Sequence, residues 1–150
     1  MKKYWYKTAM LVMALGVFTA CSDDDGPKIP EGPIALVNGA YVINTGNWNE
    51  NNGTIQWYDR DLKTVSADLF AAANGAGIGD AQDLCVYGTK IYITCSSSAK
   101  IEIVDRKDFK RIKTLNLTNE SGQPIQPRYM TAAKGNIYFT AYDGTVSQID

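Results

Sequence analysis

The residues best suited to chemistry lie in an asparagine-rich segment, Asn44–Gly53, which sets one tryptophan among side-chain amides. Amides offer both hydrogen-bond donors and acceptors, and an indole offers a flat apolar surface with a single donor. This combination is suited to holding a small ligand rather than to breaking a bond. A long asparagine turn with Trp48 facing the core explains the same residues equally well. The sequence therefore predicts that Trp48 is either a binding residue or a core residue.

A second segment, Asn74–Asp83, is rich in glycine and invites comparison with a phosphate-binding loop. It lacks the third glycine at the required spacing and a following helix, so we interpret it as a flexible loop between structural units. The chain has no histidine, which removes the commonest general base and the commonest metal ligand. No other group of residues has catalytic spacing. We therefore predict no enzyme, no cofactor and no metal site.

Two of the three cysteines, Cys85 and Cys95, belong to one predicted hairpin. Its turn at Gly88-Thr89 sets Cys85 opposite Tyr92 and far from Cys95. A disulfide needs two Cα atoms within about 7 Å of each other. We therefore predict that both thiols are free, buried and structural.

The third cysteine follows a segment with the order of residues that is typical of an export signal, residues 1–20. Lysines come first, and Thr8–Phe18 is an apolar run that is too short for a bilayer span of roughly 20 residues. Thr19-Ala20-Cys21 resembles the lipobox of bacterial lipoproteins. The resemblance implies cleavage before Cys21 and lipidation of its thiol, which anchors the chain to a membrane. A cleaved secretory signal with a chance cysteine is the alternative.

An acidic tether, residues 21–33, follows the signal. Its Ser22–Asp25 segment resembles the export signal of Bacteroidetes-type lipoproteins, which implies a position on the outer face of the outer membrane. A merely flexible acidic tether is the alternative. Removing the three lysines of the signal leaves 12 basic and 16 acidic residues, a net charge of −4. This balance argues against nucleic acid as a partner, because neutralising phosphates requires a basic surface.

An internal repeat organises residues 34–150. One six-residue segment occurs three times without gaps, as Thr54–Asp59, Lys100–Asp105 and Thr145–Asp150, and the final aspartates are 46 and 45 residues apart. A second repeated segment precedes each copy, at residues 39–43, 90–94 and 136–140. We expect the repeated aspartates to hold tight turns through their side chains.

The middle unit divides into four short predicted strands, at residues 82–87, 90–95, 99–104 and 110–117. Both faces of these strands carry apolar residues, so we expect each sheet to be covered on both sides. The predicted fold is all-β, with β-propeller blades of four antiparallel strands. The predicted blades are residues 34–70, 82–117 and 128–150.

The segment Ile91–Asp105 resembles the YVTN-type blade of YncE-like propellers. A closed ring of seven such blades needs about 320 residues. We therefore expect the chain to be the N-terminal portion of a longer protein, with two to three of seven blades.

Four segments carry a closer resemblance: Gly46-Asn47-Trp48, Asn51-Asn52, Gly77–Asp83 and Pro127–Met130. They resemble the surface propellers encoded with cobalamin-uptake systems of gut Bacteroidetes. In that family a lipoprotein captures vitamin B12 and passes it to an outer-membrane transporter. The resemblance implies a ligand that stacks on Trp48 and whose anionic group, such as a phosphate, meets Arg128. It also implies a site that includes Asn47, Asn49, Asn52 and Tyr129.

Two other functions are compatible with a propeller. One is a surface scaffold or adhesion module without a small ligand. The other is a lactonase-like enzyme, because some YVTN-like propellers resemble sugar-lactone hydrolases. Such enzymes need clustered acids, histidines or a metal, and the sequence shows no such group. We therefore expect a surface lipoprotein that binds a small nutrient, with cobalamin as the first candidate.

Overall fold

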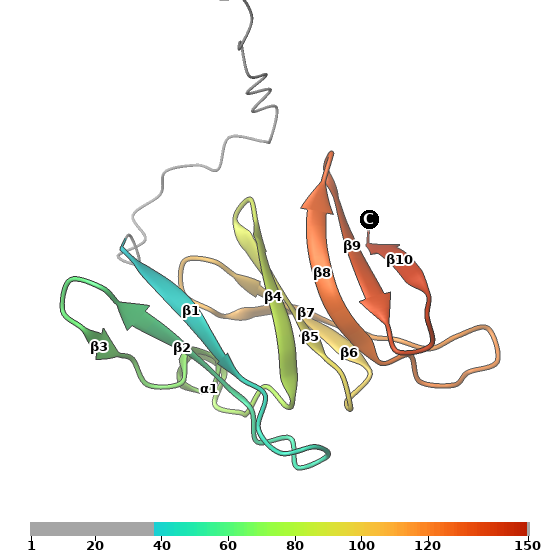
Figure 1. The fold of residues 1–150 in the computed structure, drawn as a ribbon, viewed down its shortest axis with the longest axis horizontal. Helices are drawn as coiled ribbons and strands as arrows, with labels where there is room; N and C mark the ends of the chain where they lie inside the picture. Colours follow the sequence, from blue (N-terminus) through green and yellow to red (C-terminus); the bar gives the residue numbers. More distant parts are fainter. Residues whose placement is uncertain (1–37, 150) are drawn as a thin grey trace, which may run out of the picture.

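A computed structural model describes residues 38–149, which fold into antiparallel β-sheets and one short helix (Figure 1). The signal segment, Cys21 and the acidic tether lie outside the described residues. The elements are β1 (Gly39–Asn44), β2 (Thr54–Asp59), β3 (Thr64–Val65), α1 (Leu69–Asn74), β4 (Ala81–Tyr87), β5 (Lys90–Cys95), β6 (Lys100–Asp105), β7 (Arg111–Asn116), β8 (Pro127–Ala133), β9 (Asn136–Ala141) and β10 (Val146–Ile149).

The strands form three separate sheets in chain order, which we call sheet 1 (β1-β2-β3), sheet 2 (β4-β5-β6-β7) and sheet 3 (β8-β9-β10). The prediction of an all-β chain with antiparallel sheets is confirmed. All four strands predicted for the middle unit are present, with bounds that differ by at most one residue. Among the described residues, sheet 1 has no counterpart of β4 and sheet 3 has no counterpart of β7.

The pairing register makes the repeat visible in three dimensions. Gly39 pairs with Asp59 in sheet 1, and Lys90 pairs with Asp105 in sheet 2. The strands β1, β5 and β9 are therefore equivalent, as are β2, β6 and β10. Each residue of these two strands in one sheet therefore has a counterpart at the same position in the next sheet.

The repeated aspartates hold turns, as expected. One carboxylate oxygen of Asp59 accepts hydrogen bonds from the backbone N–H groups of Asp61 and Leu62, both at 2.9 Å. Asp105 accepts in the same way from Lys107 at 2.7 Å. Asp150 lies outside the described residues.

Sheet 2 lies between the other two sheets (Figure 1). Successive side chains of a strand point to opposite faces, and both faces of sheet 2 are largely apolar. We call the face toward sheet 1 its trailing face and the face toward sheet 3 its leading face. The trailing face carries Ile91, Ile93, Cys95 and Val104, and the leading face carries Tyr92, Thr94, Ile101 and Ile103.

Each neighbouring sheet covers one of these faces. Sheet 1 packs Ile55 against the trailing face, with Tyr41 and Ile43 at its margin. Sheet 3 packs Phe139 and Met130 against the leading face. Burying a large apolar side chain contributes about 1.5–3 kcal/mol, so these two interfaces supply most of the core. The expected coverage on both sides is therefore confirmed for sheet 2.

Helix α1 was not predicted from the sequence. Asp68 caps its first turn by accepting the backbone N–H of Phe70 at 3.1 Å, and Gly75 ends it with a positive φ of 65°. Phe70 is fully buried in the core between sheets 1 and 2. Asn74 accepts the backbone N–H of Arg111 at 2.8 Å. The helix therefore attaches the segment that joins sheets 1 and 2 to both of them, through buried Phe70 and the hydrogen bond to Arg111.

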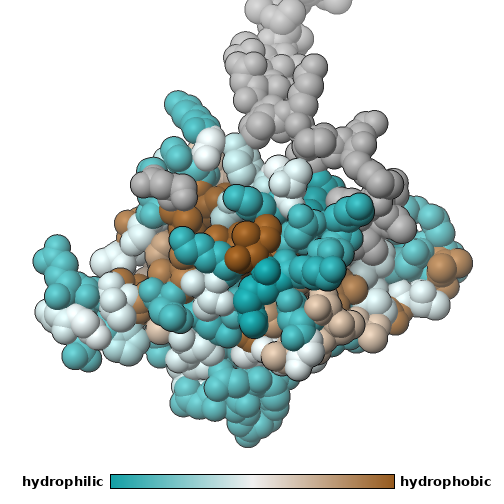
Figure 2. All heavy atoms as spheres, turned by 180° about the vertical axis from the view of Figure 1, so that it is seen from behind, coloured by the Kyte–Doolittle hydropathy of each residue, from teal (hydrophilic) through white to brown (hydrophobic). Residues whose placement is uncertain are grey.

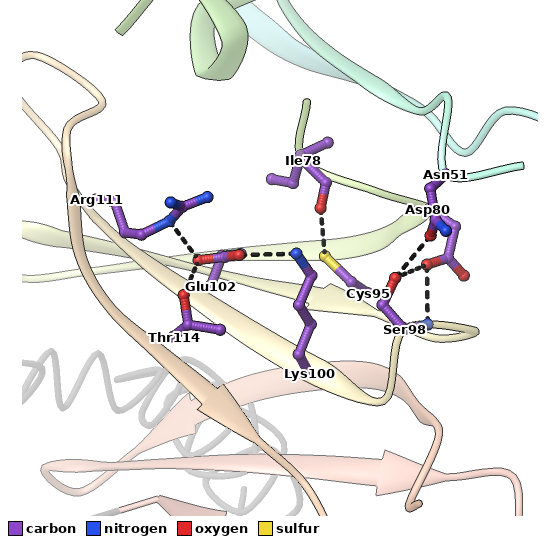
Figure 3. A network of polar contacts seen from close by, with 9 residues as sticks. All are labelled: Asn51, Ile78, Asp80, Cys95, Ser98, Lys100, Glu102, Arg111 and Thr114. Atoms are coloured by element: carbon purple, nitrogen blue, oxygen red, sulfur yellow. Dashed lines mark hydrogen bonds and ion pairs between the residues drawn. The ribbon is translucent and has the colours of Figure 1, made fainter. Parts of the chain in front are cut away.

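One carboxylate, Glu102 in β6, is almost wholly buried and fully paired (Figure 3). Lys100 Nζ lies 2.8 Å from one oxygen, and Arg111 Nε at 3.0 Å and Thr114 Oγ1 at 2.7 Å donate to the other. Burial alone raises the pKa of Glu102, but these hydrogen bonds and the two positive charges outweigh it and hold the pKa below its usual value.

Candidate functional site

Three equivalent loops lie at one edge of the stacked sheets, the lower edge in Figure 1, which we call the loop edge. They join β1 to β2 (residues 45–53), β5 to β6 (residues 96–99) and β9 to β10 (residues 142–145). The segments that lead into β4 and β8 reach the same edge. Residues far apart in sequence therefore meet there.

Trp48, in the first of these loops, is exposed to 53% of its surface. Its ring lies edge-on to that of Tyr142 in the third loop, with centroids 6.2 Å apart and an interplanar angle of 75°. Trp48 therefore does not face the core, and the core interpretation of this residue is wrong. Loop 45–53 extends from sheet 1 as far as the β9–β10 turn of sheet 3, so the indole lies outside the core.

Arg128, near the start of β8, stands beside the same tyrosine. Its guanidinium carbon lies 4.5 Å from the ring centroid of Tyr142 and 5.1 Å from that of Tyr129. Both tyrosines are about half exposed, at 48% and 54%. The structure thus brings Trp48, Arg128 and Tyr129 together, and we call these three residues with Tyr142 the aromatic cluster.

The Nε atom of Arg128 is buried and finds no hydrogen-bond partner in the part of the chain that the structure describes. The hydroxyl of Ser97, in the second loop, is in the same condition. Leaving a buried donor unpaired costs about 1–3 kcal/mol, and such groups are rare in folded proteins. The loop edge therefore holds two buried polar groups without a partner among the described residues.

Backbone contacts with sheet 2 fix the start of β8. The hydroxyl of Thr94 donates to the carbonyl oxygen of Arg128 at 2.7 Å, and that of Ser96 donates to the carbonyl of Pro127. Asp83 accepts the backbone N–H of Met130 at 2.7 Å. Arg128 therefore lies in a stretch of β8 whose backbone is hydrogen-bonded to sheet 2 at Arg128 itself and at residues before and after it.

Asn47 and Asn52, two of the predicted binding residues, form hydrogen bonds within their own loop. Asn52 Oδ1 accepts the backbone N–H of Asn47 at 2.8 Å, and both side-chain amides donate to Glu50, at 2.8 and 3.0 Å. Asn49 is exposed and occupies a turn with a positive φ of 64°. The structure therefore gives Asn47 and Asn52 a role in shaping the loop. Figure 2 shows this loop as a hydrophilic projection at the lower edge.

The glycine-rich segment before β4 supports that loop (Figure 3). Gly53 donates its backbone N–H to the carbonyl of Gly79 at 2.7 Å. Asp80 is fully buried and accepts the backbone N–H groups of Ser97 and Ser98, the latter at 3.3 Å. The hydroxyl of Ser98 lies 3.0 Å from Asp80 Oδ1 and 2.8 Å from Asn51 Oδ1.

These contacts correct the interpretation of Asn74–Asp83 as a flexible loop, because its last residues before β4 are buried and hydrogen-bonded. Asp80 and Tyr142 are the two residues of the site that sequence reasoning missed. The repeat offered a signal for Tyr142, since it starts the loop equivalent to Asn44–Gly53. No comparable signal marked Asp80.

Neither cysteine belongs to the aromatic cluster, although the thiol of Cys95 lies 3.5 Å from the carbonyl oxygen of Ile78 in the glycine-rich segment. Both Cys85 and Cys95 are free, and Cys85 pairs with Tyr92 as predicted. The prediction that both are buried holds only for Cys95, because Cys85 is partly exposed. Burial raises the pKa of Cys95 to about 12 and also raises that of Cys85, so neither thiol ionises at neutral pH. Within residues 38–149, no group of three or more ligating side chains is placed to hold a metal ion.

Comparisons with known proteins give no family for this chain. No family model matches it, and no curated protein sequence matches it. Among solved structures, it is similar to the crystal structure of the computationally designed Ika4 protein, at 13% identity and a TM-score of 0.44. That match covers 66% of this chain and 55% of the designed chain, so the chain spans about half of that structure's length.

Proposed function

We propose that the chain is part of a β-propeller lipoprotein that binds a small ligand at its loop edge. The stacking of three antiparallel sheets with equivalent strands supports a propeller, in which such sheets follow one another around an axis. Ligands prefer concave sites where several loops converge. The loop edge gathers three equivalent loops and both unpaired polar side chains described above.

The exposure of Trp48 carries this proposal. A tryptophan with half of its surface in water, held by a hydrogen-bonded loop beside Tyr142, is positioned for a partner outside the chain. A planar ligand gains stacking area on these rings. The guanidinium of Arg128, beside the exposed rings of Tyr129 and Tyr142, offers charge-assisted hydrogen bonds to an anionic group. A ligand with an apolar, largely planar body and an oxyanion fits both features.

Cobalamin is the first candidate on these grounds, since it combines a planar corrin ring with a phosphate group. The sequence resemblance to cobalamin-capturing propellers supports the same ligand and its delivery to an outer-membrane transporter. Anchoring through lipidated Cys21 places the site at the outer membrane surface. Within the described part of the chain, no helix is long and apolar enough to cross a bilayer.

Calorimetric titration of the full chain with cyanocobalamin tests the proposal. Removing an aromatic anchor from a binding site costs about 2 kcal/mol, roughly thirtyfold in affinity. We therefore expect Trp48→Ala to weaken binding at least tenfold, with a nearly unchanged melting temperature. Leu62→Ala is the matched control, because Leu62 is exposed to 73% in the β2–β3 turn at the opposite edge. A parent chain that ignores cyanocobalamin contradicts the ligand, and an unaffected Trp48→Ala variant contradicts the site.

A further inference from the structure

The stacked sheets have a second edge, opposite the loop edge, which we call the turn edge (the upper edge in Figure 1). It consists of the β2–β3, β4–β5, β6–β7 and β8–β9 turns, residues 60–63, 88–89, 106–110 and 134–135. Strand β1 begins at the same edge, where the carbonyl oxygen of Asn38 accepts the backbone N–H of Arg60 at 2.9 Å. The described chain therefore starts at the turn edge.

Charged residues divide unevenly between the two edges. The turns of the turn edge contain six basic and two acidic residues, which are Arg60, Lys63, Arg106, Lys107, Lys110 and Lys134 against Asp61 and Asp108. The connections that reach the loop edge contain five acidic residues and no basic one, and the acids are Glu50, Asp68, Asp80, Glu120 and Asp143. The turn edge is therefore the positive end of residues 38–149.

Most of the cations at the turn edge have no acidic partner in the described part of the chain. Lys110 lies 3.4 Å from Asp108, but no carboxylate of residues 38–149 lies within 4.0 Å of the other five. Lys63, Lys107 and Lys134 are exposed, and each belongs to a different sheet. The positive charge is therefore available to an external anion and is spread across all three sheets.

The β6–β7 turn, which carries three of the six cations, is held by buried contacts. Phe109 is only 4% exposed, and its ring centroid lies 5.8 Å from that of Tyr41 in sheet 1. The backbone N–H of Arg106 donates to the carbonyl oxygen of Thr89 in the β4–β5 turn at 2.8 Å. These contacts fix where the turn presents its cations.

A membrane surface is the partner that fits this distribution. Cations spread over three sheets match an extended anionic surface better than a single small anion. In a propeller this edge stays open, because neighbouring blades pack on the faces of a sheet. Near an anionic membrane, each Lys or Arg strengthens binding by about fivefold. A chain that is lipid-anchored meets such a surface continuously.

We propose that the turn edge lies against phosphate-bearing lipid headgroups, so that the loop edge and its aromatic cluster face the surrounding medium. This orientation rests on the membrane anchoring of the proposed function and is independent of the ligand. It leaves the aromatic cluster open to molecules that arrive from the medium.

Energy transfer from a dye on the protein to acceptor lipids in a membrane tests this orientation. The full lipidated chain, with Cys85→Ser, carries the dye on Thr89→Cys at the turn edge or on Ser121→Cys at the loop edge, and both positions are exposed. It is placed in vesicles of phosphatidylglycerol and phosphatidylcholine in equal parts, or of phosphatidylcholine alone. Six-residue strands separate the edges by about 20 Å. We therefore expect more transfer from Thr89→Cys than from Ser121→Cys on the anionic vesicles, and a smaller difference on the neutral ones.

Three lysines, one from each sheet, supply the variant. On anionic vesicles, Lys63→Gln, Lys107→Gln and Lys134→Gln together should abolish the difference between the two dyes. The matched control combines Asn116→Asp, Thr118→Glu and Gln123→Glu, which lowers the net charge equally beside the loop edge. It should keep the difference, because salt screens charges that are more than about 10 Å apart.

Equal transfer from the two dyes on anionic vesicles overturns the proposal, as does a difference that survives the loss of the three lysines. Flotation reads the lipid anchor separately, because a chain without lipid leaves the phosphatidylcholine vesicles. Such a chain contradicts the anchoring of the proposed function, but its transfer on anionic vesicles still reports which edge meets the membrane. A chain that floats with neither kind of vesicle overturns both.

Discussion

The indole of Trp48, in the loop after β1, lies edge-on to the phenol ring of Tyr142, in the turn after β9, at a centroid distance of 6.2 Å. This contact joins the first sheet to the third at the loop edge. The second sheet contributes to the same surface, because Ser98 in its β5–β6 loop lies 2.8 Å from Asn51. All three sheets therefore support one continuous surface.

Asp80 is expected to hold this surface in place. Asp80→Ala leaves the backbone N–H groups of Ser97 and Ser98 without their acceptor in a buried setting. Since each unsatisfied buried group costs about 1–3 kcal/mol, we expect a loss of at least 2 kcal/mol in the free energy of unfolding, measured with urea. Asp143→Ala is the control, because Asp143 accepts from Thr145 in an exposed turn. Equal losses in the two variants contradict the role of Asp80.

The lowered pKa of Glu102 is expected to make the stability of the fold depend on pH. Its pKa is lower in the folded chain than in the unfolded chain, where it is about 4.3. The carboxylate therefore stabilises the fold above about pH 4.3, and this contribution is lost as the pH falls through the folded pKa. Glu102→Gln is expected to lose about 3 kcal/mol at pH 7, because Lys100 and Arg111 lose their buried partner.

Urea unfolding of the parent and of Glu102→Gln between pH 3 and 7 checks this sign. The difference in unfolding free energy between the two chains should shrink as the pH falls below 4.3. A difference that is constant over this range shows that Glu102 does not titrate with a lowered pKa.

Cys95 is expected to be inert in the folded chain. Burial raises its pKa to about 12, so almost no thiolate exists at neutral pH, and the side chain has no exposed surface. In a Cys85→Ser background, alkylation of Cys95 by iodoacetamide at pH 7.5 should be slow in buffer and fast in urea. Mass spectrometry of the peptide that contains Cys95 measures both rates. Equal rates contradict the burial of this thiol.

Lipidation at Cys21 stays a prediction from the sequence and is tested in cells. Only a thiol at this junction accepts the lipid, so an alkyne fatty acid should label the parent chain and leave Cys21→Ser unlabelled. Cys85→Ser is the control and should keep the label. Label that persists on the Cys21→Ser variant shows that the anchor assignment is wrong.

The middle sheet was predictable because both signals for it are local. Turn residues such as Gly88 separate its strands, and Ile91 and Ile93 alternate with Tyr92 in a period of two. Helix α1 was missed because six residues are too few for a helical period, although Asp68 and Gly75 are suitable caps.

The candidate site was predictable only in part. Trp48, Arg128 and Tyr129 were named from the sequence, and the structure brings them together. Tyr142, which contacts both Trp48 and Arg128, belongs to sheet 3 together with Arg128 and Tyr129. Trp48 belongs to sheet 1, so its contact with the other residues depends on how the sheets stack. Asp80 gave no signal because a buried turn acceptor and a solvated aspartate look alike in sequence.

The central claim is that Trp48 and Arg128 contact one ligand together. A double-mutant cycle on cyanocobalamin affinity tests it most directly, with Trp48→Ala, Arg128→Gln and the double variant measured by calorimetry on the full chain. We predict that each single change weakens binding at least tenfold, and that the double variant loses less than the sum of the two in free energy, because both groups hold the same molecule. Affinities that are unchanged in both single variants would contradict the account.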